Sequence, residues 1–330
     1  MAEKSFPILF IAGSRIGDAI LSSGLLKRLY DEIPNAVFTI AVGEVAAPLF
    51  SQMPRVDEII VLEKKKFAGH WIDLWRRTSN RNWGLIVDLR GSGLSGFLRR
   101  RRRAVYRRVP EAEPIHKVLE AARLLRLEAD PPSPYLFTDP QTEAAATTYL
   151  GVGGPILAIA PGANWVGKTW PAERFAEVAT RLLAPDGPMP DGRLLILGDA
   201  ADREAGRTLQ LAVSRGRTIG APGQLDLLTA YACLKRARLF IGNDSGAMHL
   251  AAAAGAPTLG LFGPSDDRRY APWGPASLAL RGPRDFETIR RIDPDLNQVI
   301  CHMFDLPVSW VVEASKQLLA ATRAPVEPIE

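Results

Sequence analysis

The stretch RLFIGNDSGAMHLAAAAGAPTLGLFG, residues 238–263, decides the fold class of this chain. An apolar strand pattern runs to Asp244, an alanine-rich helical pattern follows, and residues 256–263 are apolar and strand-like again. Buried strands that alternate with helices build a parallel sheet with helices on both faces. The stretch therefore predicts an α/β fold.

The same alternation fills the rest of the chain, and 330 residues are too many for one ordinary core. The proline-rich segment ADPPSPYLF, residues 129–137, interrupts the alternation and is typical of a linker. Strands are predicted at 7–12, 36–42, 58–62 and 84–89 before this segment, and at 155–162, 192–198, 217–220, 237–244 and 256–263 after it. We expect one doubly wound domain at 1–135, a second at 136–306, and an amphipathic helix within 307–330 that packs back toward the first domain.

The composition is that of a folded globular protein, because 47% apolar and 23% charged residues argue against disorder. The two cysteines, Cys233 and Cys301, form no CxxC pair, which argues against a disulfide framework and a zinc site. The apolar stretch near the start is too short for a signal peptide, and no run reaches the ~18–20 apolar residues of a spanning helix. We therefore expect a cytoplasmic protein.

Positive charge is concentrated in RRRRRAVYRR, residues 99–108, which holds seven arginines in a chain of net charge +5. One interpretation is a solvated charged face. The other is a site for an anionic partner, whose phosphates, carboxylates or lipid headgroups the arginines would attract. The residues alone leave both open. The second interpretation concerns Arg99, Arg100, Arg101, Arg102 and Arg103.

Ligands of open parallel sheets bind beyond the carboxyl ends of the strands, so the strand-to-helix corners are the candidate sites. The first corner is FIAGSRIGDAILSSG, residues 10–24. Gly13 and Gly17 would let the chain turn sharply and let a ligand approach the backbone. Asp18 falls in the first helical turn, where the helix dipole alone would favour a carboxylate. The corner has no GxGxxG pattern, so a dinucleotide site is only weakly indicated.

The second corner is PGANWVGKTWP, residues 161–171, and Gly162 to Thr169 match the phosphate-binding loop of nucleotide triphosphatases. In such a loop the helix begins at the Gly-Lys-Thr, whereas Pro171 is typical of the first position of a helix that starts later. Lys168 is either an ordinary surface lysine or a phosphate contact, and its position at a corner favours the contact.

The third corner lies in the opening stretch, where the strand ends at Asp244 and Gly246 begins the next helix. Ser245 is expected to cap that helix, and the amides of its first turn would form an anion site. His249 lies on the same helical face as Ser245 and Gly246. A lone helical histidine is more often a packing residue, but here the rest of the helix is Ala, Leu and Met. We therefore expect His249 to reach the anion site.

Together the three corners resemble glycosyltransferase family 9, the lipopolysaccharide heptosyltransferases. ILFIAGSRIGDAILSSGLLKRL resembles the opening strand and R-x-G-D helix of the family. PGANWVGKTWPAERFAEVATRLL is similar to its P-G-x-x-x-x-x-K-x-W-P segment. IGNDSGAMHLAAAAGAPTLGLFGPSD is similar to its most specific signature, D-[ST]-G-x-x-H-x-A-x-x-x-x-P followed by FG-x-[ST]. Unlike many relatives, this chain has no cysteines in ALRGPRDFETIRRID.

The resemblance implies a glycosyltransferase B fold, with two Rossmann-like doubly wound domains facing a cleft. It implies inverting transfer of a heptose, without a metal or cofactor, from ADP-heptose on the second domain to an acceptor on the first. Asp18 would be the general base, and Ser14 and Gly17 would lie on the acceptor side. The implied donor-binding residues are Asn164 and Lys168 for the diphosphate, Ser245 and Gly246 through their amides, Asp244 for sugar hydroxyls, His249 beside the phosphates, and Asp202 for the ribose.

The implied acceptor is an anionic glycolipid, the lipopolysaccharide inner core, which the arginines from Arg99 to Arg103 would approach. The enzyme would be peripheral on the inner face of the cytoplasmic membrane and would bind no nucleic acid. The open alternatives are a triphosphatase or kinase that uses Gly162–Thr169, a transferase of this fold with another sugar nucleotide, and a binding protein without turnover.

Overall fold

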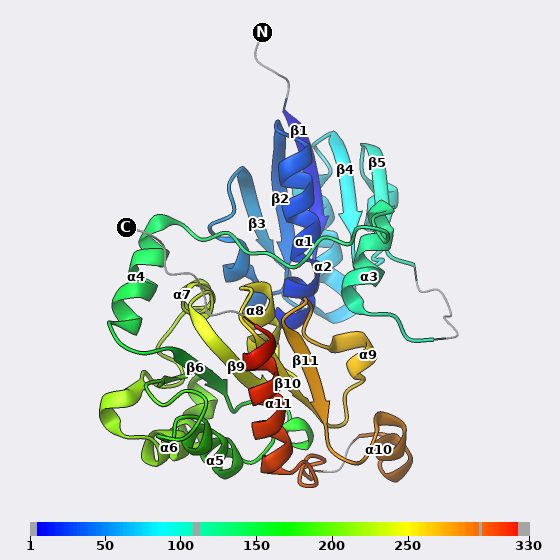
Figure 1. The fold of residues 1–330 in the computed structure, drawn as a ribbon. Coiled ribbons are helices and arrows are strands. Elements are labelled where there is room, and N and C mark those ends of the chain that lie inside the picture. The colour runs from blue at the N-terminus through cyan, green and yellow to red at the C-terminus, as the bar shows by residue number, and fades with distance from the viewer. Residues whose placement is uncertain (1–4, 108–112, 297–298, 323–330) are drawn as a thin grey trace. The chain divides into compact units, whose positions relative to one another are not determined.

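The computed structural model of the chain describes residues 5–107, 113–296 and 299–322. It divides into two compact units, Met1–Thr138 and Asp139–Glu330. Each unit is built on its own parallel sheet with helices along it (Figure 1). Within the described ranges, no helix is both long enough and apolar enough to cross a membrane.

The first unit holds a five-stranded sheet in the order β3-β2-β1-β4-β5, and every pair in it is parallel. Its elements are β1 (Phe6–Ile11), α1 (Ile16–Glu32), β2 (Ala36–Val42), β3 (Val56–Val61), α2 (Gly69–Thr78), β4 (Trp83–Asp88), β5 (Arg100–Val105) and α3 (Lys117–Ala122), with short 3-10 turns η1 (Glu44–Phe50), η2 (Lys66–Ala68), η3 (Leu94–Phe97) and η4 (Arg123–Leu125). The four strands predicted here lie within two residues of the observed ones.

The fifth strand, β5, was not predicted, because it consists largely of the arginine run. In its register with β4, Arg100 lies beside Trp83 and Arg103 beside Ile86. Ala104 is the buried residue of β5, and Arg101, Arg102 and Arg103 are exposed. An edge strand has a partner on one side only, and charged side chains there prevent further strands from adding. The run therefore has a structural role that the sequence did not indicate.

The two faces of the first sheet are covered by different helices. Leu9, Ile11 and Ile86 point to the face on which α2 buries Leu74. Helix α1 covers the opposite face and packs against α3 (Figure 1). Because all strands of this sheet are parallel, their carboxyl ends lie at one edge of the sheet, where the β1–α1 corner lies.

The proline-rich segment at 129–137 is irregular, as expected, and it packs on α1. The backbone N–H of Tyr135 donates a hydrogen bond to Ser23 Oγ at 2.9 Å. Leu136 is buried. Gly24 makes this approach possible, because a Cβ there would lie 2.3 Å from the carbonyl oxygen of Pro132. The segment is thus part of the first unit.

The second unit holds a six-stranded parallel sheet in the order β11-β10-β9-β6-β7-β8. Its elements are α4 (Pro140–Leu150), β6 (Ile156–Ala160), α5 (Ala172–Leu182), β7 (Arg193–Ile196), α6 (Arg203–Ala212), β8 (Thr218–Ile219), α7 (Leu227–Leu234), β9 (Ala237–Asn243), α8 (Gly246–Ala253), β10 (Thr258–Phe262), α9 (Asp267–Tyr270), β11 (Ser277–Arg281), α10 (Phe286–Ile292) and α11 (Val308–Ala321). Five of the six strands were predicted, and β11 was missed.

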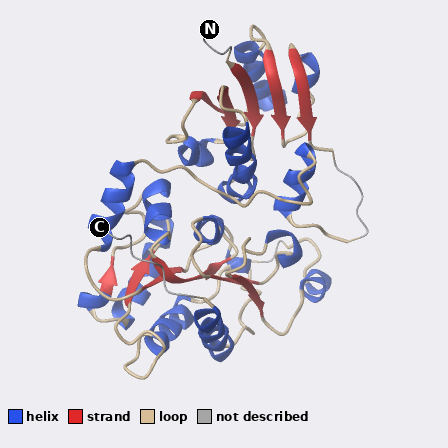
Figure 2. Ribbon diagram, turned by 45° about the horizontal axis from the view of Figure 1, so that its top comes forward, coloured by secondary structure: helices blue, strands red, loops and turns tan. Residues whose placement is uncertain are grey.

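Helices cover both faces of this sheet (Figure 2). Helices α5, α6 and α11 bury apolar side chains against Leu259, Leu261 and their neighbours. Helix α8 lies on the other face, where Met248 fills the space beside Gly260. The apolar side of α11 belongs to this core and packs on α5. That this helix also packs back toward the first domain stays a prediction.

Candidate active site

The β1–α1 corner forms the first part of the candidate site. Strand β1 ends at Ile11, and the N–H of Ala12 still donates to the carbonyl of Ala41 at 2.8 Å. Neither Gly13 nor Gly17 has a positive φ angle, so the corner does not need glycine for its backbone conformation. Gly13 is needed for space, because a Cβ there would lie 2.7 Å from the Cβ of Asp18. The corner thus brings the backbone close to Asp18.

Asp18 is half-buried in the first turn of α1, as predicted. Ser14 is exposed, and its carbonyl oxygen would lie 2.5 Å from a Cβ on Gly43, so the corner also rests on the end of β2. Gly17 is half-buried beside Asp18. The structure therefore places Ser14, Gly17 and Asp18 together at the carboxyl edge of the first sheet, and their roles stay predictions.

Two residues at the end of β4 share this edge and were not selected from the sequence. Asp88 is fully buried and accepts hydrogen bonds from the N–H of Arg90 and from both the N–H and Oγ of Ser92. Its carboxylate thereby shapes the loop that follows β4. The guanidinium of Arg90 lies 4.8 Å from the ring centroid of Trp71, and burial lowers the pKa of Arg90. An aspartate at the end of an apolar strand was the signal in the sequence that indicates this corner.

The loop between β6 and α5 carries Lys168. Residues Val166–Lys168 form a short 3-10 turn, Thr169 is extended, and α5 begins only at Ala172. Pro171 is the N-cap of α5, whereas the sequence predicted it at the first position inside the helix. A triphosphatase loop would begin its helix at the Gly-Lys-Thr, so that geometry is not formed here. The hydroxyl of Thr169 donates to the carbonyl of Trp165 at 2.9 Å.

Lys168, Asp244 and His249 come together although they lie on different elements. The Nζ of Lys168 is 3.1 Å from Oδ2 of Asp244, and Nε2 of His249 is 3.9 Å from Oδ1 of the same carboxylate. The side chains of Asp244 and His249 are 8% and 4% exposed, and that of Lys168 is 17% exposed. The cluster is therefore shielded from water on the side of Asp244 and His249 and most open at the lysine.

Helix α8 begins beside this cluster. Ser245 occupies the N-cap position, but its side chain makes no capping hydrogen bond, so the expected cap is wrong. Its Oγ is buried and has no hydrogen-bond partner among the described residues. The backbone N–H groups of the first helical turn have no partners within a helix, and the turn carries the positive end of the helix dipole. Gly246 lies at this end, which is suited to an anion.

Asn243 connects the second and third corners and was not selected from the sequence. It is fully buried at the end of β9. Its Nδ2 donates to the carbonyl of Pro161 at 2.7 Å, and its Oδ1 accepts from the N–H of Trp170 at 3.1 Å. These bonds tie both ends of the Lys168 loop to the strand that carries Asp244. Asn243 therefore holds the lysine beside the carboxylate.

Asp202 and Asn164 lie at the same edge of the second sheet. A Cβ on Gly162 would lie 1.9 Å from Oδ1 of Asp202, so this carboxyl packs directly on the end of β6. Its Oδ2 accepts from the N–H of Asp199 at 3.0 Å, in a capping box. Burial raises the pKa of Asp202. Asn164 is exposed in the Lys168 loop. Asn164 and Lys168 thus follow β6 and Asp202 follows β7, at the sheet edge where Asp244 follows β9, and their roles in donor binding stay predictions.

The arginine run begins far from the β1–α1 corner. Arg100 pairs with Trp83 at the amino end of β4, whereas the corner lies at the carboxyl end, roughly 17 Å away for five residues of strand. Arg103 lies nearer that end and lines a cavity of about 420 Å³ beyond β5. Among the described residues, the wall of the cavity contains Arg103, Arg107, Arg123 and Arg126. Glu120 also lines this part of the wall and pairs with Lys117.

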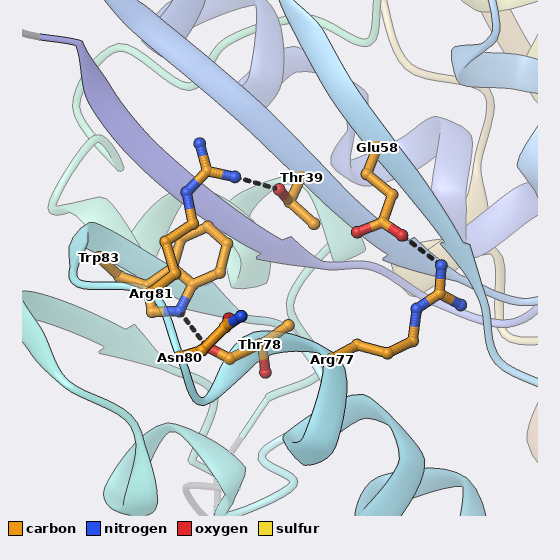
Figure 3. A pocket seen from close by; sticks show the side chains of 7 residues that line it. All are labelled: Thr39, Glu58, Arg77, Thr78, Asn80, Arg81 and Trp83. Atoms are coloured by element: carbon orange, nitrogen blue, oxygen red, sulfur yellow. Dashed lines mark hydrogen bonds and ion pairs between the residues drawn. The ribbon is translucent and has the colours of Figure 1, made fainter.

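A second cavity of about 330 Å³ lies where Trp83 begins β4 (Figure 3). Its two arginines are paired with carboxylates: Arg77 with Glu58, and Arg81 with Asp57 at 2.6 Å. The guanidinium of Arg81 also lies over the ring of Trp83. Because both cations are already paired and the cavity lies away from the carboxyl edge, it is not part of the candidate active site.

Two Rossmann-like parallel sheets with polar corners at their carboxyl edges are the architecture of a glycosyltransferase of the B fold. A model of glycosyltransferase family 9 (heptosyltransferase) matches residues 76–292. The chain belongs to this family and is a glycosyltransferase.

Curated relatives match most of the chain. It is 24% identical to lipopolysaccharide heptosyltransferase 2 of Salmonella typhimurium, over 87% of this chain and 91% of that protein. It is 27% identical to lipopolysaccharide heptosyltransferase 1 of Pseudomonas aeruginosa, over 83% of both chains.

Solved structures share the fold. A family 9 glycosyltransferase of Veillonella parvula has a TM-score of 0.78 at 20% identity, covering 98% of this chain and 99% of that one. The E. coli ADP-heptose lipopolysaccharide heptosyltransferase II has a TM-score of 0.73 at 22% identity, covering 96% and 99%. The E. coli heptosyltransferase WaaC with ADP has a TM-score of 0.67 at 16% identity, covering 95% and 100%.

Proposed function

We propose that this glycosyltransferase moves a heptose from ADP-heptose to the inner core of lipopolysaccharide, with inversion and without a metal. The observation that carries the proposal is the cluster of Lys168, Asp244 and His249 beside the first turn of α8. A lysine and unpaired helix amides in one place are suited to a diphosphate, which gathers negative charge as it leaves.

The donor roles follow from this placement. Lys168, Asn164 and the amides of Ser245 and Gly246 bind the diphosphate. Asp244 positions the lysine and accepts hydrogen bonds from sugar hydroxyls of the donor. His249 lies beside the Asp244 carboxylate and helps to hold the phosphates of the donor. Asp202, at the ends of β6 and β7, binds the ribose.

The acceptor is bound by the first unit. Asp18 takes the proton of the attacking hydroxyl while the bond from the sugar to the diphosphate breaks, so one displacement inverts the anomeric carbon. Ser14 and Gly17 border the acceptor at this corner. The cavity beyond β5, whose described wall includes Arg107, Arg123 and Arg126, is suited to the anionic groups of a lipopolysaccharide core. Because that acceptor is attached to a lipid, the enzyme would work in the cytoplasm at the inner face of the cytoplasmic membrane.

ADP is the proposed nucleotide because the family members that the chain resembles are named as heptosyltransferases, and E. coli WaaC was solved with ADP and with ADP-2-deoxy-2-fluoro heptose. The test is a donor screen in the presence of EDTA, with ADP-heptose against UDP-, GDP- and other ADP-sugars and a deacylated core acceptor. We expect binding and consumption of ADP-heptose. Preference for another sugar nucleotide, or a requirement for a metal, would overturn the corresponding part of the proposal.

The same assay separates the transferase from a triphosphatase. In a triphosphatase Thr169 would hold magnesium, and Thr169→Ala would abolish activity. In this structure the Thr169 hydroxyl bonds Trp165, so we expect Thr169→Ala to keep most of the transfer activity. Magnesium-dependent ATP hydrolysis that disappears in this variant would favour the triphosphatase.

A further inference from the structure

The outer face of α2 exposes large apolar side chains that nothing in the described protein covers. Ile72 and Trp75, three residues apart on the helix, are 53% and 42% exposed. Phe97, on the neighbouring turn η3, is 81% exposed. The Nε1 of Trp75 donates to the carbonyl of Phe97 at 3.4 Å, so the two residues are adjacent. Together they form one apolar patch.

This exposure is not required by the fold. The inner face of α2 buries Leu74 and Thr78, and Trp71 packs partly against the same core. Ile72 lies on the opposite face of the helix and Trp75 on its flank, and a surface helix normally carries polar residues at such positions. A clustered, exposed patch of this kind marks an interaction surface more often than a single exposed apolar residue does.

Arginines lie on the same side of the unit as the patch. Arg76 lies on the outer face of α2 and its side chain is 71% exposed. Arg103 pairs in register with Ile86 of β4, and Ile86 packs in the core beneath α2, so Arg103 lies on the α2 face of the sheet. A guanidinium nitrogen of Arg103 lies 3.6 Å from the position that a Cβ on Gly96 would occupy. Alternation along β5 places Arg101 on the same face. Arg101 is exposed and forms no ion pair within the described ranges.

The acidic group on the same helix, Asp73, is already paired. The carboxylate of Asp73 lies 2.7 Å from Nζ of Lys65 and 3.8 Å from Arg76, and the hydrogen bond from Lys65 lowers the pKa of Asp73. The surface therefore presents apolar side chains within a positively charged rim. We call Ile72, Trp75, Phe97, Arg76 and Arg101 the α2 surface.

We propose that the α2 surface docks this protein on an anionic lipid bilayer. Tryptophan is favoured at the boundary between headgroups and hydrocarbon, and arginines add attraction to anionic headgroups. A symmetric contact between two copies would set the cationic rims against each other, so charge complementarity favours the bilayer. The purpose of this docking, access to a lipid-linked acceptor, rests on the proposed function, whereas the binding itself does not.

The test is cosedimentation of the full chain with vesicles of phosphatidylglycerol and phosphatidylethanolamine, compared with phosphatidylcholine alone. Trp75→Ser/Phe97→Ser should lower binding to the anionic vesicles about tenfold or more. Arg76→Gln/Arg101→Gln should lower it about 25-fold at low salt, about fivefold for each cation, and flatten its salt dependence. Matched controls on the second unit are Trp310→Ser/Leu211→Ser, which are 46% and 79% exposed, and Arg215→Gln/Arg290→Gln.

A second measurement reports on Trp75 without removing an aromatic ring. Brominated lipids should quench part of the tryptophan fluorescence of the wild type, and Trp75→Phe should lose that part, whereas Trp310→Phe should not. Circular dichroism and thermal unfolding check that each variant is folded. Equal binding by surface and control variants, or equal binding to both kinds of vesicle, would overturn the proposal. So would a change of oligomeric state in the Trp75→Ser/Phe97→Ser variant without a change in vesicle binding.

The outcome is separable from that of the proposed function. Transfer to a deacylated acceptor in solution needs no bilayer, so the Trp75→Ser/Phe97→Ser variant should keep that activity. Vesicle binding without any heptose transfer would refute the proposed function and keep the docking surface. Heptose transfer without vesicle binding would refute the docking surface and keep the proposed function.

Discussion

Replacement of Lys168 by methionine tests whether this lysine serves the leaving group or only the fold. Methionine keeps the unbranched apolar stem and removes the charge that lies 3.1 Å from Oδ2 of Asp244. The variant leaves a carboxylate that is 8% exposed without its cation. Two separate losses should follow, one in stability and one in turnover.

The loss in stability can be worked from the distance. At 3.1 Å and an effective dielectric constant of about 20, the attraction between the two charges is about 5 kcal/mol. Part of that attraction offsets the desolvation of both groups, so we expect Lys168→Met to destabilise the second unit by about 2 kcal/mol. That corresponds to a fall in melting temperature of about 4–8 °C. Because Asp244→Asn removes the stranded charge, the double variant Lys168→Met/Asp244→Asn should recover most of this stability.

The loss in turnover has a different origin. Removal of one preorganised charge contact to a developing anion lowers kcat by about 10²-fold or more. The double variant cannot restore this contact, so its turnover should stay low although its stability recovers. The assay is heptose transfer at saturating donor, combined with thermal unfolding of the wild type, both single variants and the double variant.

Two results would refute the reasoning. If Lys168→Met keeps activity within a few-fold of the wild type, the lysine is a structural partner of Asp244 and the diphosphate is held by other groups. If activity returns together with stability in the double variant, the loss arose from misfolding of the corner and not from the missing charge.

Asp18→Asn should lower kcat by about 10²–10⁴-fold with donor affinity nearly unchanged, because it removes basicity and keeps shape; a collapse of donor affinity in a binding assay would assign Asp18 to the donor site or to folding. Gly162→Ala should weaken donor binding about tenfold in calorimetry, because its Cβ would lie 1.9 Å from the Asp202 carboxylate. The control Gly216→Ala, whose Cβ would have nothing within 4 Å, should bind the donor as the wild type does. Equal donor affinities of the two variants would show that Asp202 does not contact the donor. Burial raises the pKa of Cys233 to about 12, so iodoacetamide at pH 8 should leave this thiol unlabelled until the protein is unfolded; rapid labelling of the folded protein would contradict the burial.

Local patterns in the sequence determined the fold class and the candidate corners. Apolar runs and helical spacing are written in neighbouring residues, so the strands from β1 to β4 and from β6 to β10 were predictable. The motifs at Asp18, Lys168 and Asp244 follow strands directly, and the carboxyl ends of parallel strands share an edge. The sequence was therefore sufficient to place these residues at such edges and to indicate the family.

The tertiary structure decided what depends on partners distant in sequence. Strand β5 escaped prediction because an edge strand is held by backbone pairing with β4, which five arginines do not reveal. The role of Asn243 depends on Pro161 and Trp170, more than seventy residues away, and Lys168 meets Asp244 across 76 residues. Ser245 stands at the N-cap of α8, but its hydroxyl does not make the capping hydrogen bond that the local sequence predicted. Periodicity reports which residues are buried or exposed along one element, whereas these contacts arise only when separate elements pack together.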